Sequence, residues 1–175
     1  MIAGLDLSTT RIGYADPSGS THSITTSVKP KEPARRLHEL VRSLEHLLRG
    51  LGPRPRLVVI EGYVPSARGL RTLIRLAELG GVVRLRLWEL DIAYVEVNPA
   101  KLKRYATGSG GADKPAMQAA AAELGASAAN HDEADAFLLR HLGRAAYGLE
   151  AVEPDGYRAE VVASITWPDI EGASA

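Results

Sequence analysis

The sequence has no cysteine, no long apolar run and no excess of charge of either sign. Without cysteine, disulfide bonds, iron–sulfur clusters and thiolate zinc sites are excluded. No stretch approaches the roughly 20 apolar residues that a membrane helix needs. The first residues also lack the basic flank and uninterrupted apolar stretch of a signal peptide. We therefore expect a cytoplasmic protein that has no membrane partner.

The charges are balanced in number but unevenly distributed. The 21 basic residues equal the 21 acidic ones. Residues 29–104 nevertheless contain 16 bases and eight acids, whereas residues 105–175 contain four bases and 11 acids. This division predicts a surface that faces a polyanion, beside an acidic region that is either a metal site or a solvated tail. The alternative is a simple division of charge between solvated faces.

Apolar periodicity predicts an α/β fold. Three short apolar segments, joined by turns, open the chain and predict an antiparallel meander. The predicted strands are residues 2–7, 11–16, 21–28, 57–61 and 92–97. The predicted helices are residues 33–49, 70–89 (interrupted at Gly80-Gly81), 98–105, 114–124 and 130–147. This order predicts a mixed sheet with helices on both faces.

Four carboxylates occupy positions where an acidic site would form. Asp6 lies in a strongly apolar strand, where a charge is costly unless it is paired or binds a metal. Glu61 ends the fourth strand, at the carboxyl edge where α/β sheets carry their sites. Asp132 and Asp135 are spaced i, i+3 and share a helix face. Each acid alone also suits a turn, a strand end or a first helical turn. Together they favour a site for Mg²⁺, which prefers oxygen ligands.

Four segments, taken in order, resemble one family. They are GLDLSTTRIGYA, VVIEGY, NPAKLKRYATGSGGADKPAMQ and HDEADAFLL. This sequence of motifs is similar to that of the RuvC Holliday-junction resolvases, which are metal-dependent endonucleases with an RNase H-like fold. The resemblance implies a five-stranded mixed sheet, with the first three strands antiparallel and helices on both faces. It extends over residues 1–147, the expected nuclease domain.

Carried over by position, the resemblance implies two sets of functional side chains. The acidic set would bind Mg²⁺ or Mn²⁺, as two ions per site, and consists of Asp6, Glu61, Asp132 and Asp135. The basic set, Lys103 and Lys114, would stabilise negative charge beside the scissile phosphate. The alternative for both lysines is an exposed charge on a helix, with Lys114 following an N-cap at Asp113. We expect His131 to be a capping residue or a neighbour of the metal ligands.

Residues that follow Glu61 are predicted to contact DNA. Tyr63 lies in the segment GYVPSARG, near the position where the family has a base-stacking Phe, and its ring can also stack on a base. Arg68 and Arg71 are the expected phosphate contacts. The helix at 70–89 is apolar on more than one side, which predicts packing on the sheet and on a second copy of the chain. A fully internal helix is the alternative. The expected partners are therefore branched DNA and a homodimer mate.

The activity implied by the resemblance is symmetric cleavage of four-way DNA junctions. One alternative is a RuvC-like phage nuclease that cuts branched or flap DNA with loose selectivity. Another is a catalytically idle nucleic-acid-binding module, although the four acids argue against it. The segment GLDLSTTRIG also resembles the first phosphate motif of actin-like ATPases, but those proteins need two such subdomains and this chain has room for one.

The last residues lie beyond the resemblance. Residues 148–175 contain one base and six acids and are expected to form an acidic C-terminal extension. The apolar segment at 159–167 predicts an added strand there. The alternative is a mobile tail.

Overall fold

A computed structural model describes residues 1–29, 31–50, 53–63 and 69–170. Five strands form one sheet, in the order β3-β2-β1-β4-β5. The strands are β1 (Ile2–Leu7), β2 (Arg11–Ala15), β3 (Thr21–Thr25), β4 (Leu57–Glu61) and β5 (Ala93–Val97). Neighbouring strands are antiparallel from β3 to β1 and parallel from β1 to β5. The predicted mixed sheet, with its first three strands antiparallel, is therefore confirmed.

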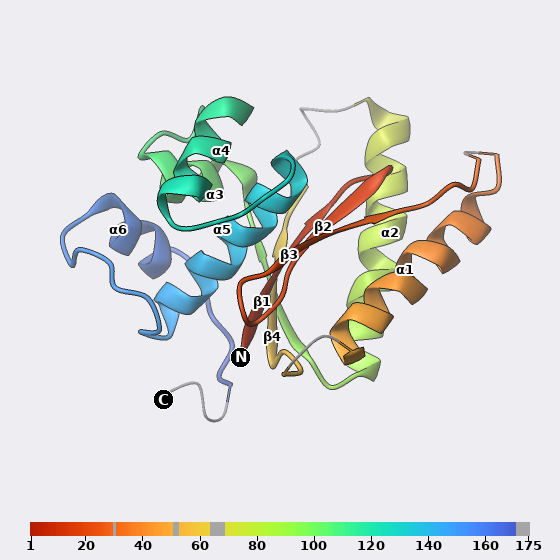
Figure 1. Cartoon of the computed structure of the whole chain (residues 1–175), viewed down its shortest axis with the longest axis horizontal. Coiled ribbons are helices and arrows are strands. Elements are labelled where there is room, and N and C mark those ends of the chain that lie inside the picture. The colour runs from red at the N-terminus through yellow and green to blue at the C-terminus, as the bar shows by residue number, and fades with distance from the viewer. Residues whose placement is uncertain (30, 51–52, 64–68, 171–175) are drawn as a thin grey trace.

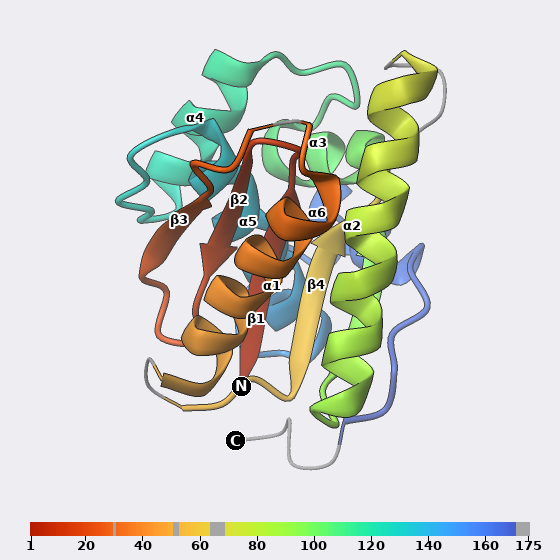
Figure 2. The same ribbon diagram turned by 90° about the vertical axis from the view of Figure 1, so that its right-hand side faces the viewer.

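Helices cover both faces of this sheet. They are α1 (Pro33–Gly50), α2 (Leu70–Glu89), α3 (Pro99–Thr107), α4 (Lys114–Glu123), α5 (His131–Ala146) and α6 (Tyr157–Ala163). In Figure 1, α5 lies on one face with α3, α4 and α6 beyond it, and α1 and α2 lie on the other face. Figure 2 shows α1 and α2 side by side in front of β1 and β4. None of the helices in the described ranges is long and apolar enough to cross a membrane.

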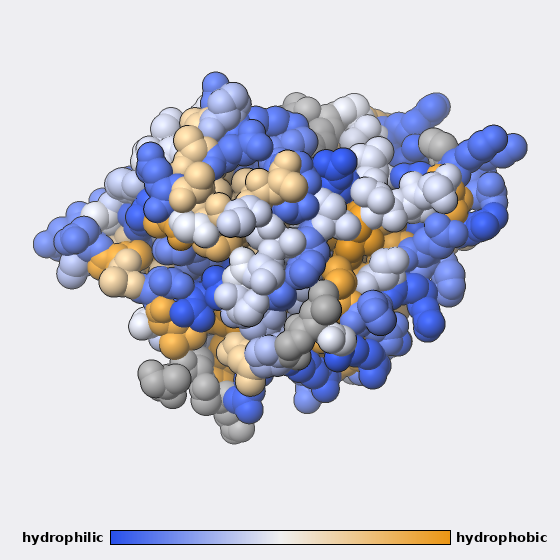
Figure 3. Space-filling model, viewed as in Figure 1, coloured by the Kyte–Doolittle hydropathy of each residue, from blue (hydrophilic) through white to orange (hydrophobic). Residues whose placement is uncertain are grey.

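The central strand β1 is buried on both faces, which explains why all of its residues except Asp6 are apolar or glycine. Ala3, Leu5 and Leu7 pack in the core under α1 and α2. Ile2 packs in the other core, with α5 and the helices outside it. Hydrophilic residues dominate the surface over α1 in Figure 3, as expected for a helix with one apolar face.

Two glycines allow α5 to lie directly on the sheet. A Cβ atom at Gly4 of β1 would lie 1.9 Å from the carbonyl oxygen of Ala136. A Cβ atom at Gly13 of β2 would lie 2.0 Å from the carbonyl oxygen of Asp132. Both contacts are with the helix backbone, which cannot move aside as a side chain can. The absence of a side chain at these positions therefore sets how closely the helix that carries Asp132 approaches the strand that carries Asp6.

The predicted interruption of the long helix at Gly80-Gly81 is wrong. Helix α2 is continuous from Leu70 to Glu89. Glycine costs a helix about 1 kcal/mol relative to alanine, which is less than the packing of the buried Leu76, Leu79 and Val83 contributes on the same helix. Strand β3 also ends earlier than expected, at Thr25. The next side chain, Thr26, hydrogen-bonds Glu39 of α1 and directs the chain away from the sheet.

The C-terminal segment does not add a strand, and its described part is not a loose tail. Residues 157–163 form α6, which packs against α3 and α5. Val161 and Ile170 are buried in the core on the α5 side of the sheet. The strand prediction failed because the apolar residues of this segment are covered by helices, and a pattern of buried apolar residues in a short segment does not by itself distinguish a strand from a helix.

Candidate active site

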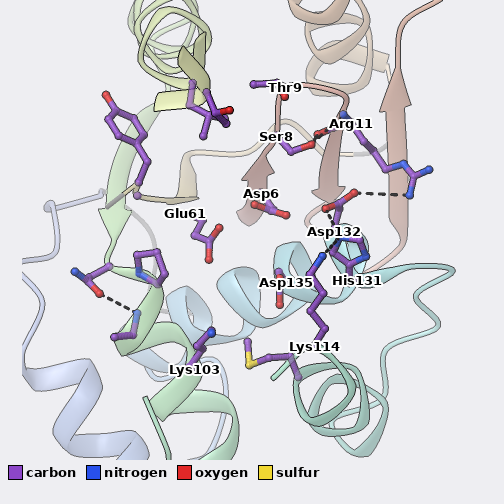
Figure 4. Close-up of a pocket in the computed structure, with 18 of the residues that line it drawn as sticks. Asp6, Ser8, Thr9, Arg11, Glu61, Lys103, Lys114, His131, Asp132 and Asp135 are labelled. Atoms are coloured by element: carbon purple, nitrogen blue, oxygen red, sulfur yellow. Dashed lines mark hydrogen bonds and ion pairs between the residues drawn. The ribbon is translucent and has the colours of Figure 1, made fainter. Parts of the chain in front are cut away.

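A single cavity receives all six residues expected to be catalytic. It has a volume of about 890 Å³ and lies at the carboxyl ends of β1 and β4, beside the first turn of α5. Its lining includes Asp6, Glu61, Lys103, Lys114, Asp132 and Asp135. Figure 4 shows the four carboxylates turned toward one space, with the two lysines approaching it from α3 and α4. Parallel pairing of β1 with β4 accounts for this, because it brings the ends of the two strands to the same edge.

Asp6 is the most deeply buried carboxylate of this group. Burial raises the pKa of Asp6 well above its ordinary value, and the negative charges of Glu61, Asp135 and Asp132 raise it further. A buried carboxyl among three others is costly to ionise, and a bound cation would remove that cost.

Asp135 lies one helical turn after Asp132 and has the same character. Burial raises its pKa to about 7, with further contributions from Glu61 and Asp132, whereas the positive charges of Lys114 and Lys103 lower it. The Oδ1 atom of Asp135 is buried and has no hydrogen-bond partner among the described residues. A buried carboxylate oxygen without a hydrogen-bond donor is suited to bind a cation.

The first turn of α5 fixes the orientation of the aspartates. Asn130 is the N-cap, and its side chain accepts a hydrogen bond from the backbone N–H of Glu133. The Glu133 carboxylate accepts hydrogen bonds from Thr21 and Ser23 of β3, at 3.0 and 2.6 Å. Burial acts to raise the pKa of Glu133, but its hydrogen bonds from Ser23, Ala129 and Thr21 outweigh burial and lower it. Glu133 therefore anchors the first turn of α5 to β3 and does not line the cavity.

Lys114 and His131 form the edge of the cavity nearest α4. Lys114 is the first residue of α4, after the N-cap Asp113, and its Nζ atom lies 2.9 Å from His131 Nε2. His131 Nε2 also lies 3.1 Å from Asp132 Oδ1. His131 does not cap α5, because Asn130 occupies that position. It is instead the neighbour of Asp132, the second of the two roles expected for it.

Arg11 is a cavity residue for which the sequence suggested no role. Its Nη1 atom lies 3.7 Å from Asp132 Oδ2, and its Nε atom is buried without a hydrogen-bond partner among the described residues. The antiparallel pairing of Leu7 with Ile12 explains its position, since it brings the start of β2 beside the end of β1. The sequence feature that could have identified Arg11 is the short connection between the strand that contains Asp6 and the next strand, which begins with this basic residue.

Tyr63 is the predicted DNA contact that the structure places at the cavity, on its α2 side. Tyr63 lines it, but its ring packs on α2, where a Cβ atom at Gly80 would lie 3.4 Å from Tyr63 Cε1. Its side chain also hydrogen-bonds Arg84. Arg71 is exposed in the first turn of α2. Arg68 lies outside the described residues.

The carboxylates of the cavity fit Mg²⁺ or Mn²⁺ better than a metal ion whose ligands all come from the protein. Within the described ranges, no group of three or more His, Asp or Glu side chains is arranged to hold one ion. Mg²⁺ does not need such a group, because it keeps several waters and takes one or two carboxylates together with substrate phosphate. A divalent cation bound among the carboxylates would give the Oδ1 atom of Asp135 a partner and would offset the repulsion that raises the pKa of Asp6.

The raised pKa values predict how pH affects the stability of the metal-free protein. Asp135 binds its proton more tightly in the folded state, at a pKa of about 7 against an ordinary value of 3.8. The contribution of Asp135 to stability is therefore greatest below pH 4 and falls as pH rises toward 7, by at most about 1.4 kcal/mol per pH unit. Asp6 acts in the same direction.

Thermal melting in EDTA across pH 4.5–8 tests this linkage. Asp135→Asn should flatten the decline, and Mg²⁺ should stabilise the wild type more at pH 8 than at pH 5. An identical pH dependence in wild type and variant would mean that Asp135 titrates normally.

A cluster of carboxylates at the carboxyl edge of a mixed sheet, flanked by two lysines, is the kind of site that metal-assisted nucleases use. A match to the family described as crossover junction endodeoxyribonuclease RuvC covers residues 2–139. The chain belongs to the RuvC family. It is a metal-dependent endonuclease that resolves Holliday junctions, and it therefore acts in DNA recombination and repair.

Two solved structures support the fold. The Thermus thermophilus RuvC structure shares 22% sequence identity with this chain at a TM-score of 0.63. T. thermophilus RuvC in complex with Holliday junction substrate has the same identity and a TM-score of 0.64. Each alignment covers 85% of this chain and 96% of the other. The search of curated proteins gave no match.

Proposed function

We propose that the chain cleaves each junction strand with two divalent ions, Mg²⁺ or Mn²⁺, held by the four carboxylates of the cavity. The observation that carries this proposal is the convergence of acids from β1, β4 and α5 on one space, where burial and mutual repulsion raise the pKa of Asp6 and Asp135. When bound, such ions activate a water molecule and stabilise the leaving oxygen of a phosphodiester.

The basic residues of the cavity provide the remaining electrostatic support. Lys103 and Lys114 enter from two separate helices, so their ammonium groups can contact a phosphate from different sides. A fixed cation beside the phosphate stabilises the charge that develops during hydrolysis. Arg11, held near Asp132, supplies a third positive group at the same rim. His131 bridges Lys114 and Asp132 and so restrains both side chains.

Selectivity for junctions can be tested directly with labelled substrates. We expect a four-way junction to be cut in Mg²⁺ at symmetric positions on two opposed strands, leaving nicks that DNA ligase seals. A flap and a linear duplex of the same sequence should be cut at least tenfold more slowly. Equal rates on junction and flap would instead favour a branched-DNA nuclease with loose selectivity.

Paired cleavage is best explained by a homodimer, formed through α2. Leu70 is 73% exposed, Ile74 50%, Leu85 55% and Trp88 73%. These side chains follow one another at helical spacing along α2, and a side chain at Gly81 would meet open space. Such an apolar row suits a self-complementary contact between two copies, which would present two equivalent sites to a four-way junction.

Sedimentation tests this assembly. The wild type should sediment at twice 18.7 kDa at micromolar concentration. Ile74→Glu and Leu85→Glu should give monomers, because a charge at the centre of an apolar interface is left without a partner. Arg42→Glu, on the exposed face of α1, is the matched control and should leave the dimer intact. A wild type that sediments only at 18.7 kDa would contradict the dimer.

The DNA path is proposed to run from the cavity over the start of α2, with Arg71 and Arg68 as phosphate contacts and Tyr63 as a stacking residue. Arg71→Ala should lower the slope of log K for DNA binding against log salt concentration by about one unit.

Tyr63→Ala should weaken junction binding by ~1–3 kcal/mol and leave duplex binding unchanged, because only an opened branch point offers a base for stacking. Stacking requires Tyr63 to leave its contact with Gly80. Equal losses on both substrates would limit Tyr63 to packing on α2.

A further inference from the structure

The C-terminal segment covers α3 on the side away from the cavity. Helix α6 packs against both α3 and α5, and Figure 1 shows it beside α3, outside the layer formed by α5. Val161 of α6 is buried, and Val162, Ile165 and Trp167 pack against the same core. The family match ends at residue 139. The contact is therefore a feature of this chain that the family assignment does not explain.

Polar contacts tie α6 to one face and one end of α3. Lys101 Nζ donates a hydrogen bond to the Ser164 carbonyl oxygen at 2.8 Å. Arg158 Nε donates to the carbonyl oxygen of Tyr105 at 3.1 Å, and Nη2 to that of Ala106 at 3.5 Å. The last carbonyl groups of a helix have no partner within it and favour a cation. Arg158 therefore caps the C-terminal end of α3.

Tyr105 contacts both Arg158 and α5, the helix that carries Asp132 and Asp135. Its ring is fully buried, and the Arg158 guanidinium lies 5.7 Å from the ring centroid. Its hydroxyl forms a 2.7 Å hydrogen bond with His141 Nδ1 of α5. Helix α3 is thus held from α5 on one side and from α6 on another.

Lys103 lies on the opposite side of α3 from these contacts. Successive residues of an α-helix are separated by about 100°. The side chains of Lys101 and Tyr105, each two positions from Lys103, therefore project from the far side of the helix, where Lys101 contacts Ser164 and the Tyr105 ring contacts Arg158. Lys103 is left facing the cavity. Any rotation or shift of α3 would move its ammonium group relative to the carboxylates.

We propose that the C-terminal segment 148–170 is a positioning element for catalysis, in which Arg158 fixes the end of α3 and thereby holds Lys103 in the cavity. This inference rests on the proposed function of Lys103. Arg158 touches neither the cavity nor its carboxylates; it acts through α3.

The test is single-turnover cleavage of a four-way junction by the full chain in saturating Mg²⁺, together with the junction Kd. Arg158→Ala should lower the cleavage rate roughly 10- to 100-fold, since displacement of a catalytic group by about 1 Å can cost that much. The Kd should stay within twofold, and Arg158→Lys should recover part of the rate. Glu160→Ala removes only the exposed ion pair with Arg104 on the same two helices, and it should cleave as the wild type does.

A Lys103→Ala background separates positioning from general damage. There, Arg158→Ala should cause almost no further loss. A loss by the same factor in both backgrounds, or a wild-type rate in Arg158→Ala alone, would overturn the inference. If Lys103→Ala itself cleaves at the wild-type rate, the proposed function of Lys103 fails instead. Melting curves must show each variant folded at the assay temperature.

Discussion

Asp6→Asn and Asp135→Asn are expected to lose cleavage by at least ~10²–10³-fold while binding the junction as tightly as the wild type or more tightly. Each substitution keeps the shape of the side chain and removes a negative charge. The ions then lose a ligand, whereas repulsion of the DNA phosphates decreases. Glu61→Gln and Asp132→Asn should behave in the same way. The measurements are single-turnover cleavage and junction binding in Ca²⁺.

Asp155→Asn is the matched control, because it makes the same chemical change at an exposed residue of the C-terminal segment. It should cleave at the wild-type rate. If any two of the four cavity variants cut at nearly the wild-type rate, the assignment of the metal ligands is wrong.

Gly13→Ala is expected to destabilise the fold by several kcal/mol, roughly 3 or more. The added methyl group would lie 2.0 Å from the carbonyl oxygen and 2.4 Å from the carbonyl carbon of Asp132. Relief requires α5 to move away from β2, which would also displace Asp132 from the other carboxylates. Urea denaturation would measure the loss of stability, and junction cleavage by the remaining folded protein should fall with it.

Gly50→Ala is the control for this substitution. Gly50 lies at the end of α1, and a Cβ atom there would meet only the His46 ring, at an ordinary 3.9 Å. Its replacement should change stability by no more than about 1 kcal/mol. If Gly13→Ala is as stable as Gly50→Ala, the close approach of α5 to β2 is not as described.

The elements that carry the acids could be predicted because their patterns are strong. β1 is an apolar segment with one acid, Asp6, near its end, β4 is an apolar run that ends in Glu61, and α5 follows a recognisable N-cap signal at Asn130. The glycine pair in α2 and the apolar segment after α5 misled the prediction. In both cases packing against other elements outweighed the local preference, and that packing is not visible in the local pattern.

The sequence predicted the acidic and basic residues of the site better than it predicted the residues that surround them. The order of motifs selected six residues, and the pairing of β1 with β4, together with the packing of α3, α4 and α5, brings them to one cavity. Arg11 and Glu133 were not selected, because their roles depend on which strands are neighbours. The position of the Tyr63 ring beside Gly80 likewise depends on how the end of β4 packs against α2. The local sequence pattern does not predict that packing.

The most direct measurement is an anomalous difference map from crystals of the protein grown with Mn²⁺. We predict two peaks in the cavity, ~3.5–4 Å apart, each contacted by carboxylate oxygens from among Asp6, Glu61, Asp132 and Asp135. Asp135→Asn crystals should lose at least one of the two peaks. A map with no peak among these four carboxylates, at Mn²⁺ concentrations that support junction cleavage, would contradict the proposed metal site.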